Sequence, residues 1–167
     1  IIGGGAVGCE MANAWSALGT EVTIIERSER LLTKFEPFVG KQLIDSFRSR
    51  GINVLTKTNV IKVQRGQKHQ VELLLNNGTS LIAGELLVAA GRQPNTQDLG
   101  LETVNLKPGS WVETNDNCLV KNVDGDWLYA VGDINHRALL THAGQYQAKV
   151  CADNIITHSL GIVPPAS

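Results

Sequence analysis

The stretch of sequence that decides the fold is Ile-Ile-Gly-Gly-Gly-Ala-Val-Gly, residues 1–8 of 167. The two isoleucines are typical of the end of a strand, and glycines follow at positions 3, 5 and 8 with the spacing Gly-x-Gly-x-x-Gly. Apolar side chains then recur as on one face of a helix at Val7, Met11, Trp15 and Leu18, and Trp15 is expected in the core. Gly19 suits the helix end. The stretch predicts a strand, a tight turn and a helix over residues 6–18.

Each glycine of this motif has its own physical reason. Gly3 permits the tight turn after the strand, Gly5 lets a pyrophosphate approach the backbone, and Gly8 lets the helix pack closely on the strand. The following helix presents unpaired N–H groups and a partial positive charge to the phosphates. The motif therefore predicts a dinucleotide site, although a glycine-rich turn that binds no ligand can have the same spacing.

A carboxylate stands where such a site needs one. Residues 22–25 are all apolar or β-branched, as in a strand buried on both faces of a parallel sheet, and Glu26 ends this run 18 residues after Gly8. At this spacing a carboxylate accepts hydrogen bonds from ribose hydroxyls and repels a 2′-phosphate, which favours NAD over NADP. Arg27 and Arg30 would offset part of that repulsion. The alternative is a solvated charge at a strand end.

The remaining pattern alternates strands and helices. A helix is expected at 36–50, since Pro37 suits its first turn and Gly51 follows its last. Asn77-Gly78 predicts a hairpin turn with positive φ at both residues, and the apolar run at 86–90 predicts a central strand. Further strands are expected at 52–55, 60–64, 71–75, 79–83 and 128–131, and a long helix at 139–160 before Gly161, Pro164 and Pro165. The fold class is α/β, Rossmann-like, with a parallel sheet and a β-hairpin or meander crossover.

Charge and cysteine content exclude several classes of protein. Lys and Arg number 15 against 16 Asp and Glu, a net charge of −1, so neither nucleic acid nor an anionic membrane finds a basic patch. No apolar run reaches the roughly 18–20 residues of a transmembrane helix. The cysteines stand too far apart for a Cys-x-x-Cys pair, which indicates a reducing, cytoplasmic setting. They are Cys9, Cys118 and Cys151.

The sequence predicts neither a metal site nor a catalytic residue. The histidines, which lack metal-ligand spacing, are His69, His136, His142 and His158. There is no Gly-x-Ser-x-Gly elbow for a hydrolase. The first residue is Ile1 rather than Met, and we expect that polypeptide is missing upstream of it.

Two later segments complete the set of motifs. Residues 87–95 read Leu-Val-Ala-Ala-Gly-Arg-Gln-Pro-Asn, and residues 128–133 read Leu-Tyr-Ala-Val-Gly-Asp. Each is an apolar strand that stops at small and polar residues, where open α/β sheets bind ligands. With the glycine motif and the Cys9-Glu10 that follows it, they make the chain resemble the flavoprotein pyridine nucleotide-disulfide oxidoreductases, the group that contains dihydrolipoamide dehydrogenase, mercuric reductase and glutathione reductase. The resemblance covers nearly all of residues 1–160.

The resemblance implies a role for each segment. Residues 3–10 would be the NAD(P) loop, and residues 90–95 would mark the crossing back into an FAD-binding domain. Asp133 would hydrogen-bond a hydroxyl of the flavin's ribitol, and residues 140–143 would lie along the isoalloxazine edge, with the backbone of His142 rather than its ring.

Two further positions follow from the same resemblance. Glu10 would lie near the flavin–nicotinamide contact and pair with a lysine of the FAD domain. Ala6 stands where several members carry an aromatic gate, so that role is not transferred, and the small residue favours a dihydrolipoamide dehydrogenase-like member. The candidate cofactor-binding residues are Gly3, Gly5, Ala6, Val7, Gly8, Glu10, Glu26, Arg27, Val60, Ala90, Gly91, Arg92, Gly132, Asp133, Leu140, Thr141 and His142.

The resemblance also implies what lies elsewhere. The family begins with a separate FAD-binding glycine motif and a redox Cys-x4-Cys pair, and it ends with an interface domain that carries a His-x4-Glu unit; these 167 residues contain none of them. We therefore expect a central fragment: residues 1–90 an NAD(H)-binding domain, 91–160 the C-terminal segment of the FAD-binding domain, and 161–167 a tail.

The expected function is the nicotinamide-dinucleotide-binding core of a flavin-dependent oxidoreductase. Hydride would pass from NADH to FAD and on to an unknown electron acceptor, for which a disulfide is one candidate, with NADP less favoured than NAD. The chain alone is expected to be inactive, and the full-length protein is expected to be a homodimer. The alternative is a stand-alone NAD(H)-binding sensor or regulatory module. Gly132, Asp133 and the helix after them favour the enzyme, because a sensor has no need of them.

Overall fold

The structure is a computed structural model that describes residues 1–66 and 70–161. It divides into two compact units, Ile1–Gly91 and Arg92–Ser167, and each is described by itself. Among the described residues, no helix is both long and apolar enough to cross a bilayer. Outside the described residues lie His69, Pro164, Pro165 and all but the first residue of the expected tail.

A parallel sheet lies at the centre of the first unit. β1 (Thr23–Ile25) pairs in parallel with β2 (Asn53–Leu55). Ile2 forms parallel bridges both to Ile25 and to Val88, so the layer runs in the order 88, 2, β1, β2. The residues that follow Ile2 and Ile25 therefore emerge at the same edge of the sheet, the edge at which open α/β sheets bind ligands.

The segment 86–90 is less regular than its apolar run predicts. It contributes a single bridge at Val88, whose side chain is 63% exposed. The segment exchanges two backbone hydrogen bonds with Ile2. The N–H of Ile2 donates to the carbonyl of Leu87, and the N–H of Ala89 donates to the carbonyl of Ile2. Because no strand of the described part of the unit pairs with its other side, the segment forms an edge, and the prediction of a central strand is wrong.

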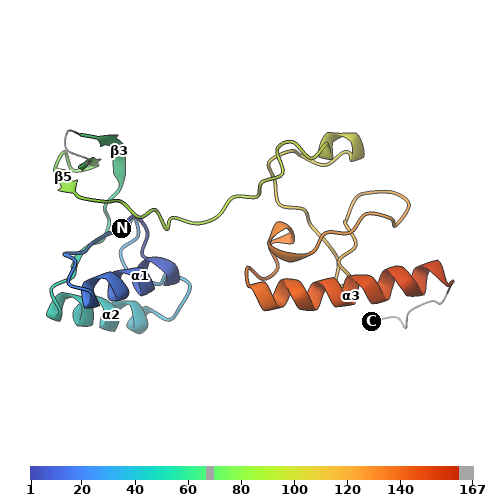
Figure 1. The fold of residues 1–167 in the computed structure, drawn as a ribbon, viewed down its shortest axis with the longest axis horizontal. Coiled ribbons are helices and arrows are strands. Elements are labelled where there is room, and N and C mark those ends of the chain that lie inside the picture. Colours follow the sequence, from blue (N-terminus) through green and yellow to red (C-terminus); the bar gives the residue numbers. More distant parts are fainter. Residues whose placement is uncertain (67–69, 162–167) are drawn as a thin grey trace. The chain divides into compact units, whose positions relative to one another are not determined.

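Two helices pack on one face of this sheet (Figure 1). α1 (Ala6–Ala17) and α2 (Pro37–Ser49) lie within one residue of their predicted limits, and each is followed by a glycine with positive φ, Gly19 and Gly51 respectively. Helices and strands share one apolar cluster: Cys9, Ala12, Val22, Ile24, Leu31, Ile44, Phe47, Ile52 and Val54. Burial of this face holds the unit together.

α1 rests on its small residues rather than on its large ones. Gly8, Cys9 and Ala12 are buried, whereas Trp15 is 49% exposed and Leu18 is also exposed. The prediction that Trp15 belongs to the core is wrong. The reason is the close approach at Gly8, which brings the helix backbone against the strand end and turns the larger apolar side chains outward.

An antiparallel sheet follows in the order β3 (Val60–Arg65), β4 (Val71–Leu75), β5 (Ser80–Ala83). Alternate side chains of β4 are buried, and they pack against Ile25 of the parallel sheet in a second apolar cluster. The first unit is therefore built of helices, a parallel sheet and an antiparallel meander, as the α/β prediction requires.

The turn between β4 and β5 differs in type from the prediction. Gly78 has a positive φ, but Asn77 does not. The N–H of Leu75 bonds the carbonyl of Thr79, and the N–H of Gly78 bonds the carbonyl of Leu75. A loop of three residues is closed in this way, with glycine at the left-handed position, so a two-residue turn with positive φ at both positions is not formed.

The second unit has little regular structure apart from one long helix. It contains the short helices η2 (Leu101–Val104) and η3 (Gly132–Asn135) and the helix α3 (Thr141–Ser159). The strand predicted at 128–131 is reduced to one bridge between Leu119 and Tyr129 and is only partly buried, so that prediction is wrong. A small apolar cluster formed by Leu101, Val112 and Val120 supports the unit.

Candidate functional site

The glycine motif adopts a turn in which two of its glycines are sterically required. Gly3 has φ +107°, and a Cβ there would overlap the carbonyl oxygen of Ala89, next to the backbone of Ala90. A Cβ at Gly8 would overlap the carbonyl oxygen of Gly3. Gly5 differs, because nothing lies within 4 Å of the position its Cβ would take. The space beside Gly5 is therefore open to a ligand.

The N-terminus of α1 opens onto the same turn. Gly5 is its N-cap, no side chain caps it, and its first turn carries no acidic residue. The first N–H groups of a helix have no partner within the helix, and the positive end of the helix dipole attracts anions. Ala6, Val7 and Glu10 are exposed on this helix. The arrangement suits a phosphate group.

Glu26 lies against the glycine turn, as the spacing in the sequence predicts. One carboxylate oxygen, Oε2, accepts the N–H of Gly4 at 2.6 Å, and the other, Oε1, accepts the N–H of Ser28 at 2.7 Å. Burial by itself would raise the pKa of Glu26, but the hydrogen bonds from Ser28 and Gly4 and the charge of Arg27 together lower it. The carboxylate is therefore ionised at neutral pH, with lone pairs left for further donors.

The two arginines near Glu26 are placed differently. The guanidinium of Arg30 donates to the backbone carbonyls of Phe35, at 2.8 Å, and Thr33, at 3.2 Å. Arg27 is exposed, and none of the hydrogen bonds found among the described residues engages its guanidinium. The guanidinium of Arg30 is thus used to hold the loop at residues 33–35, while that of Arg27 remains available to a ligand.

Cys9 is a structural thiol. It is buried in the apolar cluster under α1, and its Sγ lies 3.5 Å from the carbonyl oxygen of Gly4. Burial, followed by the charges of Glu26 and Glu10, raises the pKa of Cys9 to about 11. A thiol that stays protonated at neutral pH is a poor nucleophile, so Cys9 is not suited to redox chemistry.

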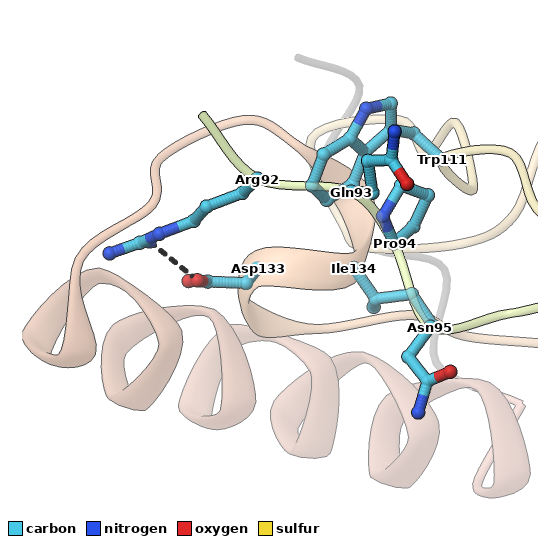
Figure 2. Close-up of a pocket in the computed structure, with 7 residues that line it drawn as sticks. All are labelled: Arg92, Gln93, Pro94, Asn95, Trp111, Asp133 and Ile134. Atoms are coloured by element: carbon cyan, nitrogen blue, oxygen red, sulfur yellow. Dashed lines mark hydrogen bonds and ion pairs between the residues drawn. The ribbon is translucent and has the colours of Figure 1, made fainter. Parts of the chain in front are cut away.

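The second unit has an exposed turn around Asp133 that the sequence singled out. Arg92 Nη1 donates to Asp133 Oδ2 at 2.7 Å and to the carbonyl oxygen of Leu139 at 3.2 Å. Figure 2 shows this pair among the residues that line a pocket. The volume of the pocket is about 370 Å³. The pocket is lined by Arg92, Gln93, Pro94, Asn95, Trp111, Asp133 and Ile134. Both charged side chains are 52% exposed, so each remains accessible.

Two buried amide side chains hold this turn. Gln147 Oε1 of α3 accepts the N–H of Gly132 and the Nδ2 group of Asn135, both at 2.8 Å. Asn135 Nδ2 also donates to the carbonyl oxygen of Ala130 at 3.0 Å. Gly132 has φ +81°, a conformation that favours glycine. If Gly144 of α3 carried a Cβ, that atom would lie only 3.3 Å from the Cα of Gly132, so the turn packs closely on the helix.

The N-terminus of α3 follows Asp133 closely in sequence. Leu140 is its N-cap without a side-chain cap, and the first turn, which includes Thr141 and His142, carries no acidic residue. All three residues are exposed. The unpaired N–H groups at this helix end form a second position that suits a negatively charged or hydrogen-bond-accepting ligand atom.

The structure gathers most, though not all, of the residues that the sequence singled out. Gly3, Gly8, Glu26 and Ala90 meet at one edge of the first unit, and Arg92, Gly132 and Asp133 meet in the second. Val60 packs against the apolar cluster that also contains Ile25, the residue before Glu26. Gly91, with φ +124°, ends the first unit.

Three residues with a role at these turns were missed from the sequence. Ser28 ties down Glu26, and Asn135 and Gln147 hold the turn before Asp133. Gln147 could have been found from its spacing, because it lies four residues before Cys151 and therefore on the same face of α3. A polar residue on a buried face needs a hydrogen-bond partner. Ser28 donates to Glu26 through its backbone N–H, and its side chain also lowers the pKa of Glu26 by hydrogen bonding. A serine two residues after the carboxylate was the available signal.

The comparisons with known proteins agree with this architecture. The family model described as pyridine nucleotide-disulphide oxidoreductase matches residues 1–148. A dihydrolipoyl dehydrogenase of Chlamydia pneumoniae is 34% identical over 159 residues, which are 95% of this chain and 34% of that relative. A mercuric reductase of Staphylococcus aureus is 32% identical over 160 residues, 93% of this chain and 29% of that relative. The chain thus spans about a third of the length of these curated relatives.

Solved structures show the same fold. The LpdA protein of Mycobacterium tuberculosis superposes with a TM-score of 0.79 at 24% identity, over 99% of this chain and 35% of that one. A water-forming NADH oxidase from Lactobacillus brevis, solved with NADH, gives a TM-score of 0.78 at 21% identity, over 99% of this chain and 36% of that one. At these identities the likeness shows the fold.

Proposed function

The chain belongs to the pyridine nucleotide-disulphide oxidoreductases, a family of flavin-dependent enzymes, and on that premise we propose that its first 90 residues bind NAD(H). The observation that carries the proposal is the turn at Gly5. It leaves open space beside an uncapped helix N-terminus, with the carboxylate of Glu26 hydrogen-bonded to the neighbouring Gly4. A pyrophosphate fits the first feature, and a ribose diol fits the second.

The environment of Glu26 favours NADH over NADPH. Its pKa is lowered, so at neutral pH a full negative charge would face a 2′-phosphate. Arg30, which could have compensated, is engaged by the carbonyls of Thr33 and Phe35. Arg27, whose charge contributes to lowering the pKa of Glu26, would allow weak binding of NADPH.

Residues 91–160 are proposed as the C-terminal segment of an FAD-binding domain. The residues present suit a flavin: Asp133 offers a half-exposed acceptor at a pocket, and the glycine before it lets a ligand approach the backbone. The N-terminus of α3 adds free N–H groups. A bound flavin would supply hydride acceptance, while this chain's part would be to bind and orient it through Asp133 and the backbone of residues 140–142.

The activity of a whole protein of this family requires more than the residues matched here. We propose that the 167 residues alone bind NADH without retaining flavin or turning over, because they span only about a third of the curated relatives. For a full-length form we propose hydride transfer from NADH through FAD to an acceptor, a homodimer, a lysine partner for Glu10, and a cytoplasmic setting. The regulatory alternative, a stand-alone NAD(H) sensor, gives no role to the Asp133 turn.

The experiment compares titrations of the chain with NADH and NADPH. Wild type is expected to bind NADH at least tenfold more tightly. Glu26→Ala should weaken NADH about 10-fold to 100-fold, through the loss of hydrogen bonds to a charged acceptor, and should weaken NADPH less, so that the preference for NADH falls. Glu29→Ala is the matched control, because Glu29 lies three residues away and forms an exposed ion pair with Lys57. An unchanged preference in Glu26→Ala would refute the ribose assignment, and stoichiometric flavin absorbance would refute the claim that flavin is not retained.

A further inference from the structure

Both oxygens of the Glu26 carboxylate accept hydrogen bonds from within the chain. Its two oxygens accept backbone N–H groups from two separate segments, Gly4 at 2.6 Å and Ser28 at 2.7 Å. Gly4 lies inside the phosphate-binding turn and is 22 residues away from Glu26 in the chain. Charge-assisted bonds of this length belong to the stronger class of hydrogen bonds in proteins.

Gly4 is also held through its carbonyl, which belongs to the next peptide group. Its carbonyl oxygen accepts the N–H of Leu32 at 2.8 Å and faces the thiol of Cys9 at 3.5 Å. A Cβ on Gly4 would overlap the side chain of Leu31 and would lie 3.1 Å from Glu26. The segment from Glu26 to Leu32 therefore wraps around the residue Gly4 and holds the peptide groups on both sides of it, so the glycine turn cannot shift without breaking its bond to Glu26.

We propose that Glu26 is a positioning residue for the phosphate-binding turn, in addition to its proposed role as ribose acceptor. The carboxylate sets the orientation of the Gly3–Gly4 peptide, and with it the turn that leads to Gly5, before a nucleotide arrives. Phosphate recognition then depends on Glu26 even for a ligand that has no ribose hydroxyl. Pre-organisation of this kind raises affinity because the turn loses less conformational freedom on binding. The inference rests on the proposed nucleotide site for its functional meaning, whereas the clamp, by which we mean the two hydrogen bonds from Gly4 and Ser28 to Glu26, is formed within the chain.

The first test needs no ligand. Amide hydrogen exchange, followed by NMR on the full chain, should show Gly4 and Ser28 protected in wild type and in the control Glu29→Gln. In Glu26→Ala both amides lose their acceptor, and their exchange should accelerate about tenfold or more. Glu26→Gln keeps one accepting oxygen, so at least one of the two amides should accelerate. Protection that persists at both amides in a folded Glu26→Ala variant would overturn the clamp.

The second test uses inorganic pyrophosphate, which carries phosphates but no hydroxyl groups of a sugar. Charge alone predicts that removal of the Glu26 carboxylate tightens the binding of an anion. The clamp predicts the opposite sign, a loss of affinity of about tenfold in Glu26→Ala, with Glu29→Gln close to wild type. Unchanged or tighter binding in Glu26→Ala would overturn the positioning role. If wild type binds no pyrophosphate, the phosphate site itself is refuted, and the exchange experiment still decides the clamp.

Discussion

The two candidate ligand-binding turns of this chain, one in each unit, are held by different forces. The turn at residues 3–8 lies on a layered core, and steric contact with backbone atoms dictates Gly3 and Gly8. The turn at Gly132-Asp133 has a smaller apolar cluster beside it, and the side-chain amides of Asn135 and Gln147 fix it. Where backbone atoms pack closely around a turn, few residue types fit at its positions. Where side-chain amides hold a turn, its stability depends on a few hydrogen bonds.

The core behind the first turn should give the largest effect. Phe47 of α2 is 1% exposed and fills the cluster between helices and sheet. Phe47→Ala should destabilise the first unit by about 3–5 kcal/mol, since it removes buried area and leaves a cavity. Urea unfolding followed by circular dichroism measures this loss. Phe38→Ala on the exposed side of the same helix is the control and should cost less than about 1 kcal/mol. Equal losses would show that the cluster does not support the unit.

A pair of glycine substitutions separates packing from ligand contact in the first turn. Gly8→Ala places a Cβ on the carbonyl of Gly3 and should cost about 1–3 kcal/mol together with nucleotide binding. Gly5→Ala meets open space at φ −76°, so stability should change by less than about 0.5 kcal/mol while the affinity for NADH falls. Thermal unfolding and NADH titration give the two readouts. Unaltered NADH affinity in Gly5→Ala would argue against a pyrophosphate beside Gly5.

The amide-tied turn of the second unit should be sensitive to one side chain. Gln147→Leu keeps a similar volume but leaves the N–H of Gly132 and the Nδ2 group of Asn135 without their shared acceptor. The expected cost is about 1–3 kcal/mol, the penalty for buried donors without a partner. Hydrogen exchange with mass spectrometry on peptides covering residues 128–137 should show faster exchange. The neighbouring exposed Gln145→Leu serves as control, and faster exchange there too would contradict the specific role of Gln147.

Acid should weaken the first turn through Glu26. Its pKa is lower in the folded chain than the ordinary value of 4.5, because the hydrogen bonds from Ser28 and Gly4 and the charge of Arg27 outweigh burial. The unfolded chain then binds more protons, so Glu26 contributes stability above that ordinary value and the contribution is lost as pH falls through the folded pKa. The urea midpoint should drop less on acidification in Glu26→Gln than in wild type. Identical pH profiles would mean that the carboxylate is not held.

The smallest effect is expected at the exposed ion pair of the second turn. Arg92 and Asp133 are each 52% exposed, and water screens their attraction. Asp133→Asn should therefore cost at most about 1 kcal/mol of stability, measured by thermal unfolding at low and high salt. A loss above about 2 kcal/mol would show that the pair, rather than the amides of Gln147 and Asn135, holds this turn.

Local signals in the sequence predicted the helices well and the edges of sheets poorly. The apolar run at 86–90 gives the same pattern whether a strand is paired on one side or on both, and only the hydrogen bonds of Ile2 show the single pairing. Trp15 lies on the helical face that its spacing predicts, but that face turns outward. Periodicity defines a face of a helix without saying which neighbour it meets.

The sequence by itself determined the motif chemistry of this protein. Glycine is the residue that a strained turn requires, and a carboxylate at the next strand end follows from spacing alone, so Gly3, Gly8 and Glu26 could be placed before any coordinates. The tertiary structure decided how these parts act on one another. Three directional hydrogen bonds do this: Gly4 donates to Glu26, Arg30 donates to the carbonyl of Phe35, and Gly132 donates to Gln147. Their partners are fixed only when the chain has folded, because distance and angle decide a hydrogen bond and neither is written in residue order.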